Sequence, residues 1–250
     1  MIPLPTATDM KPRAKLLVGV TALCLSCTAY LAVRAETCRR AIHEESNLRG
    51  RDPSHVGLFC LWQIEAGAPV KQTPTFWQLL GGARPVEVWL NGDAEPPVTV
   101  EQAQRMGNAL RFFRSLKKIN VQAAGAEGMA LFMSLGRQPA LTEAYAIRVP
   151  ITDDVNQALA RFPNLRVLDL ATTQYTGSGF PWLPELTSVD VQYSPISIEG
   201  LRSITESPKL AAIVVYYPPL VRQYAEVSLE IKKKHPHLLG LDFDLSAVPK

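Results

Sequence analysis

Residues 165–194 read LRVLDLATTQYTGSGFPWLPELTSVDVQYS, and this stretch contains one apolar pattern twice. In each copy, apolar residues at the first, fourth and sixth places are followed three places later by a hydroxyl residue. The first copy consists of Leu165, Leu168, Leu170 and Thr173. The second consists of Leu186, Val189, Val191 and Ser194. A unit this short cannot bury its own apolar face, so we expect neighbouring copies to stack on one another.

Weaker copies of the same pattern extend from about residue 83 to the C-terminus. Their first positions are Ala83, Leu116, Ala144, Leu165, Leu186, Leu210 and Leu238. The two apolar positions that follow are Val86 and Val88, Ile119 and Val121, Ile147 and Val149, Leu168 and Leu170, Val189 and Val191, Ile213 and Val215, and Leu241 and Phe243. Alternation of apolar and polar residues at these places predicts seven strands, each with one buried face.

The segments between the strands carry helix signals where they are long enough. Thr99 and Gln102 form a capping-box pair, and Ser197 precedes an apolar stripe. Further helices are expected after Thr152 and from Pro219. A doubly wound sheet is the competing α/β architecture, but residues 171–185 contain two glycines and two prolines and have no apolar stripe, so they cannot supply its crossover helix.

Residues 83–246 therefore resemble an irregular leucine-rich repeat domain. That resemblance implies an α/β solenoid with parallel strands on its concave side and short helices on its convex side. It also implies a curved surface that binds protein or another large ligand, and it transfers no catalytic residues to this chain.

The N-terminus has the composition of a membrane segment. Residues 16–33 are uncharged, with Lys11, Arg13 and Lys15 before them and Arg34 after them. As a helix they would rise about 27 Å, close to the roughly 30 Å hydrocarbon core of a bilayer. An uncleaved signal anchor and a cleaved signal segment both remain open. The expected organisation is a tail (1–15), this segment (16–33), a juxtamembrane linker and N-terminal cap (34–82) and the repeat-like domain (83–250).

This organisation predicts a single-pass membrane protein whose C-terminal domain is extracytoplasmic. In an oxidising compartment, Cys38 and Cys60 are candidates for a disulfide, with two free thiols as the alternative. The aromatic-rich residues 51–82 are expected to cover the first repeat, because the ends of stacked repeats need a cap.

The concave face supplies the predicted binding site. The residue between the last two apolar positions of each strand points outward, and these residues are Glu87, Asn120, Arg148, Asp169, Asp190, Val214 and Asp242. Aromatic residues are expected beside them: Trp89, Tyr193 and Tyr216. Acids outnumber bases in this column, which favours a partner with basic groups, although outward strand positions are polar in any sheet.

The predicted function is a membrane-anchored, non-enzymatic scaffold that binds a protein or peptide, and the expected ligand is basic. No cofactor or metal is expected, because phosphate-binding loops, metal motifs and nucleophile elbows are missing from the sequence. The net charge of +3 is dispersed, which argues against nucleic-acid binding. The alternatives are an envelope-associated enzyme or lipid-handling protein, with a site formed by residues 51–82 against the repeats, and a purely structural envelope component.

Overall fold

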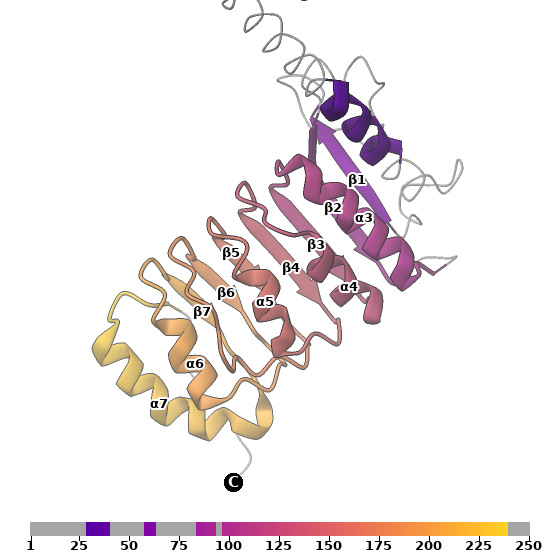
Figure 1. The fold of residues 1–250 in the computed structure, drawn as a ribbon. Coiled ribbons are helices and arrows are strands. Elements are labelled where there is room, and N and C mark those ends of the chain that lie inside the picture. Colours follow the sequence, from indigo (N-terminus) through magenta and orange to yellow (C-terminus); the bar gives the residue numbers. More distant parts are fainter. Residues whose placement is uncertain (1–28, 41–57, 64–83, 94–96, 240–250) are drawn as a thin grey trace, which may run out of the picture.

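A computed structural model describes residues 29–40, 58–63, 84–93 and 97–239. These residues form a seven-stranded sheet with its strands in chain order (Figure 1). The strands are β1 (Leu58–Gln63), β2 (Arg84–Asn91), β3 (Lys118–Gln122), β4 (Glu143–Ile147), β5 (Val167–Asp169), β6 (Ser188–Asp190) and β7 (Ala212–Val214). Strands β2 to β7 are parallel, which confirms the predicted α/β class with parallel strands.

Strand β1 was not predicted. It pairs antiparallel with β2 and lies at the edge of the sheet, within the segment that we expected to act as the N-terminal cap. The sequence LFCLWQ has no strict alternation of apolar and polar residues, so a search for half-buried strands passes over it.

The described helices after β2 cover one face of the sheet (Figure 1). They are α3 (Val100–Phe113), α4 (Ala126–Ser134), α5 (Asn156–Leu159), α6 (Ile198–Thr205) and α7 (Val221–Lys234), with short 3₁₀ turns at Asp153–Val155 and Pro218–Leu220. The capping box of Thr99 and Gln102 at α3 and the Ser197 cap at α6 are confirmed. Thr152 precedes a 3₁₀ turn, but its side chain does not cap it.

The hydrophobic core lies between these helices and the sheet. Leu168 and Val189 are paired on neighbouring strands and are almost completely buried, as are Leu170 and Val191, which confirms the register predicted for this pair of repeats. Each strand pairs only with its chain neighbours, so the core extends along the sheet as a row of similar layers.

The predicted register is wrong for two strands. In β2 the residues in register with Ile119 and Val121 are Val88 and Leu90, two places later than expected. Val86, Val88 and Leu90 stand at alternate positions in β2, so a shift of the pairing by two residues leaves the same side chains facing the core. In β4 the corresponding residues are Ala144 and Ala146, not the Ile147 and Val149 that we predicted, because small buried alanines fill the core there.

The connection from β5 to β6 contains no helix, as predicted. A buried hydroxyl pair stabilises its start: the Thr173 amide donates to Ser194 Oγ (2.9 Å), and Ser194 Oγ donates to the Leu170 carbonyl (2.7 Å). The two hydroxyl residues that follow the paired apolar patterns therefore connect neighbouring turns. Further along, the Asp153 carboxylate accepts hydrogen bonds from the Thr176 and Gly177 amides, both at 3.0 Å.

A backbone hydrogen bond recurs just beyond the ends of successive strands. In each case an amide donates to a carbonyl of the next strand segment: Gly92 to Gln122, Ala123 to Ile147, Arg148 to Ala171, Thr172 to Gln192 and Tyr193 to Tyr216. Four of these donors have left-handed backbone conformations although they are not glycine: Ala123, Arg148, Thr172 and Tyr193. These four turns therefore share one backbone conformation at the donor residue although their sequences differ.

Much of the predicted N-terminal organisation lies outside the described residues. Residues 29–40 are helical, and they include the last part of the predicted membrane segment 16–33. Within the described ranges, no helix has the length and apolar character needed to cross a bilayer.

Candidate binding face of the sheet

The sheet face opposite the helices carries the candidate site. Side chains alternate along each strand, so residues adjacent to the buried positions point to this face. Cross-strand pairing places its middle residues in one row: Trp89, Asn120, Tyr145, Asp169, Asp190 and Val214. We call this row the central row. It runs from aromatic and amide groups at β2–β4 to carboxylates at β5 and β6.

Asp169 and Asp190 lie side by side on neighbouring strands. Each carboxylate accepts one hydrogen bond from the backbone amide two residues ahead, Asp169 from Ala171 at 3.0 Å and Asp190 from Gln192 at 2.9 Å. Within the described part of the chain, neither carboxylate forms an ion pair. Burial raises the pKa of both carboxyls, and the charge of Asp190 raises the pKa of Asp169 further. This is a pair of acids without a counter-charge.

An aromatic cluster surrounds Lys118 at the β2–β4 end. The Lys118 ammonium lies 4.9 Å from the ring centre of Tyr145 and 5.6 Å from that of Trp89, within the range of cation–π attraction. It is also 3.5 Å from the Glu143 carboxylate, which accepts a hydrogen bond from the Tyr145 hydroxyl at 3.1 Å. Burial and the neighbouring Glu143 raise the pKa of Tyr145, so it stays protonated at neutral pH.

Asn120 lies between Trp89 and Tyr145 in the central row and is 6% exposed. Its Oδ1 atom is buried and has no hydrogen-bond partner in the structure. A buried acceptor without a partner is unfavourable by roughly 1–3 kcal/mol. A ligand donor would relieve this cost if the side chains that cover the oxygen moved aside.

Two tyrosines form a second aromatic group at the carboxyl ends of the strands. The rings of Tyr193 and Tyr216 meet edge to face with their centres 5.4 Å apart, and their exposed fractions are 54% and 43%. Exposed aromatic side chains that keep one another in place provide contact area for a partner at a small entropic cost.

The structure brings together most of the predicted site but changes its arrangement. Asp169 and Asp190 are neighbours as predicted, and Tyr193 and Tyr216 meet at the strand ends. Trp89, which we expected beside the outward-pointing residues, is itself in the central row and pairs with Asn120. Glu87 is displaced by the same slip and accepts a hydrogen bond from Trp89 Nε1 at 3.3 Å.

Arg148 is not part of the central row, and its predicted position is wrong. It follows the end of β4 in a left-handed conformation, and its guanidinium is 3.8 Å from the Asp93 carboxylate. Tyr145 occupies the expected place of Arg148 because the core positions of β4 are alanines. Sequence reasoning also missed Lys118 and Glu143, although the polar–apolar alternation of KINVQ and EAYAI was a usable signal.

Other predicted features are only partly described. Asp242 lies outside the described residues, as does most of the 51–82 segment on which the enzyme or lipid-handling alternative depends. Cys38 is a half-buried free thiol whose pKa is raised by burial. Because Cys38 is a free thiol, the candidate Cys38–Cys60 disulfide is not formed in this structure; the side chain of Cys60 lies outside the described residues. No group of metal-ligating side chains occurs in the part of the chain that the structure describes.

Neither protein-family models nor curated proteins match this chain. The chemistry of the sheet face therefore carries the functional inference.

Proposed function

We propose that this protein is a non-enzymatic binding scaffold whose central row binds a protein segment bearing basic groups. The observation that carries the proposal is the Asp169–Asp190 pair: two adjacent, half-buried carboxylates that form no ion pair with any described residue. Lysine or arginine from a partner would relieve their repulsion, so binding would be strengthened and steered by charge.

The rest of the central row supports an extended peptide as the ligand. The Asn120 Oδ1 atom has no hydrogen-bond partner among the described residues, and a peptide amide would reach it if the side chains that cover it moved aside. The aromatic residues on either side, Trp89 and Tyr145, provide flat apolar contact area, and the Tyr193–Tyr216 pair provides more at the strand ends. The sheet thus offers an acceptor, apolar surface and negative charge on one face.

We also propose that the domain is a leucine-rich-repeat-like solenoid. Two features support this: the strands are arranged in chain order, and the hydrogen bond beyond each strand recurs in five successive turns. Stacked repeats that differ in sequence but share such turns present one continuous face to a partner.

Membrane attachment through residues 16–33, with the binding domain extracytoplasmic, completes the proposed function. It is supported by the uncharged stretch and its flanking basic residues. In this arrangement the scaffold would hold a basic partner near the membrane surface.

Site-specific photocrosslinking in cells tests the proposed face. A photoreactive residue at Ala171, on the open face beyond β5, should capture a partner, whereas the same residue at Glu199, exposed on α6, should not. Full-length D169N/D190N should reduce the captured yield and make it less sensitive to salt. The matched control is E199Q/E226Q, which removes two exposed charges from the helical side. Equal capture by all variants would mean that the acids do not select the partner.

A further inference from the structure

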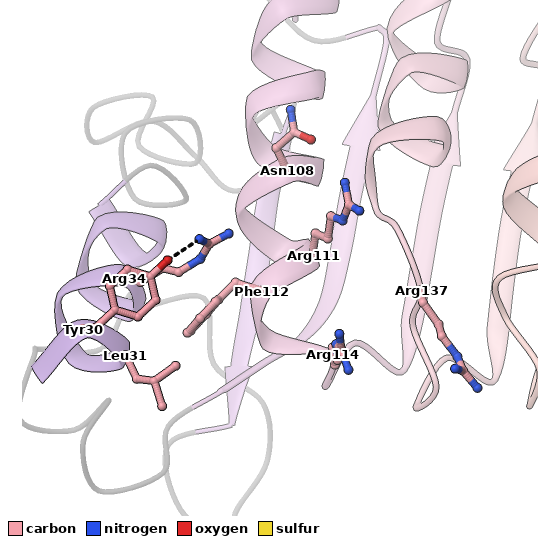
Figure 2. A pocket seen from close by; sticks show the side chains of 8 residues that line it. All are labelled: Tyr30, Leu31, Arg34, Asn108, Arg111, Phe112, Arg114 and Arg137. Carbon is pink, nitrogen blue, oxygen red and sulfur yellow. Dashed lines mark hydrogen bonds between the residues drawn. The ribbon is translucent and has the colours of Figure 1, made fainter. Parts of the chain in front are cut away.

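A cavity of about 430 Å³ lies between the helix over residues 29–40 and the last turn of α3 (Figure 2). None of its lining residues belongs to the central row. The lining residues are Tyr30, Leu31, Arg34, Asn108, Arg111, Phe112, Arg114 and Arg137. Four of the eight are arginines and none is acidic, which distinguishes this cavity from the acidic sheet face.

Local contacts hold the side chains of two of the four arginines, Arg34 and Arg111. The Arg34 guanidinium donates a hydrogen bond to the Tyr30 hydroxyl at 2.9 Å and lies 5.7 Å from the ring centre of Phe112. Arg111 packs against Gly136, where an added Cβ would lie 2.7 Å from Arg111 Cγ. Arg114 ends α3 in a left-handed conformation, and Arg137 directly follows Gly136 at the rim (Figure 2).

In the part of the chain that the structure describes, these arginines differ from other basic side chains in having no carboxylate partner. Arg202 pairs with Glu230 and Lys209 with Glu185, both at 2.7 Å. Among the described residues, none of the four cavity arginines forms an ion pair. The C-terminal ends of α3 and α4 favour nearby cations, but that attraction is small at exposed positions and does not require a cavity.

We propose that this cavity binds a phosphate group. Guanidinium donors form paired hydrogen bonds to phosphate oxygens, and several arginines around one hollow match a doubly charged anion. Leu31, Tyr30 and Phe112 add an apolar wall, so the bound phosphate can carry an apolar portion. Two sources have this chemistry: the headgroup of an anionic lipid and a soluble phosphorylated compound. Under the proposed membrane attachment, residues 29–33 bring the cavity next to the bilayer surface, which favours the lipid.

Binding measurements on the full-length protein in neutral detergent test the site. The probes are inorganic phosphate, dihexanoyl phosphatidic acid and, as a zwitterionic control, dihexanoyl phosphatidylcholine. We expect saturable binding of phosphatidic acid and a loss of at least about tenfold in affinity for R111Q/R114Q. The charge-matched control R105Q/R166Q removes two exposed arginines outside the cavity and should bind as the wild type does.

The outcomes separate the source of the phosphate from the existence of the site. Tighter binding of phosphatidic acid than of inorganic phosphate identifies a lipid ligand, and equal binding identifies a soluble one. Loss in both double variants, unchanged binding in R111Q/R114Q, or equal binding of phosphatidylcholine would overturn the proposal. Thermal unfolding of each variant establishes that it is folded. None of these results depends on the central row, so the site can fail while the proposed scaffold function stands.

Discussion

On the short strands, neighbouring residues serve different purposes: one stabilises the core and the next lies on the proposed binding face. In β5, Leu168 is 1% exposed and faces the core, while its neighbour Asp169 is half-buried on the open face. Alternation along a strand puts these two opposite requirements one residue apart. Substitutions at adjacent positions should therefore have different consequences.

Replacement of Leu168 by Ala should lower the free energy of unfolding by about 2–5 kcal/mol, because it leaves a cavity in a well-packed layer. Urea unfolding monitored by circular dichroism measures the loss. The matched control is Val167→Ala on the open face of the same strand, which should cost well under half as much. A Leu168→Ala loss within about 0.5 kcal/mol would contradict the burial of this position.

The acid pair should make stability depend on pH. Burial raises the pKa of Asp169 and Asp190, so the folded state binds protons at these carboxyls more tightly than the unfolded state does. The stability that this proton binding contributes is complete below the unfolded pKa of about 4, and it is lost as the pH rises through the folded pKa. D169N/D190N retains a side-chain oxygen for the backbone amides. We expect it to be more stable than the wild type at pH 7, with the difference shrinking towards pH 4. Urea titrations at both pH values measure this; an equal difference at both would show that ionisation is not its cause.

Secondary-structure elements are held together by close backbone contacts on the helical side. Gly200 in α6 lies against the loop that joins β5 to β6, where a Cβ at this position would be 2.2 Å from the Thr176 carbonyl oxygen and 2.8 Å from Gly177 Cα. The Ser197 amide also donates to the Thr176 carbonyl at 2.9 Å. The helix therefore packs closely on the loop because residue 200 has no side chain.

Gly200→Ala should destabilise the protein, although glycine to alanine in a helix ordinarily stabilises it by up to about 1 kcal/mol. The added methyl group would have to push a backbone segment away. Ser203→Ala in the same helix is the control, since it raises helix propensity at a partly exposed position. Thermal unfolding should show a lower midpoint for Gly200→Ala alone; a raised midpoint would mean that the loop yields without cost.

The described part of the molecule has different charge at different places. Uncompensated carboxylates lie on the open sheet face near β5 and β6, while uncompensated guanidiniums line the cavity beside residues 29–40. The net charge of +3 conceals this separation. Two sites of opposite sign in one chain suit a basic protein partner and an anionic small ligand.

Membrane topology is a prediction for the whole molecule. With residues 16–33 as an anchor and the N-terminus inside, protease added to intact cells or spheroplasts should digest the domain that follows Arg34. Immunoblotting against the C-terminal region measures the digestion, and a cytoplasmic protein in the same cells controls for lysis. Protection until the cells are lysed would reverse the proposed orientation.

How far the sequence predicts the fold depends on side-chain size. The strands around Leu168 and Val189 were predicted in the right register because large apolar residues stand at every buried position. The register of β4 was not, because Ala144 and Ala146 give a weak apolar signal beside Ile147 and Val149. In β2, alternation alone cannot distinguish positions two residues apart.

The sequence by itself determined the parallel α/β class, the two principal helix caps, the helix-free connection from β5 to β6, and the adjacency of Asp169 and Asp190. All of these follow from local periodicity and capping chemistry. Only the tertiary structure decided that Tyr145 and Lys118 join the sheet face, that Arg148 does not, and that arginines from three segments of the chain line one cavity. Those outcomes depend on register and on packing between segments far apart in the chain, which local patterns do not encode.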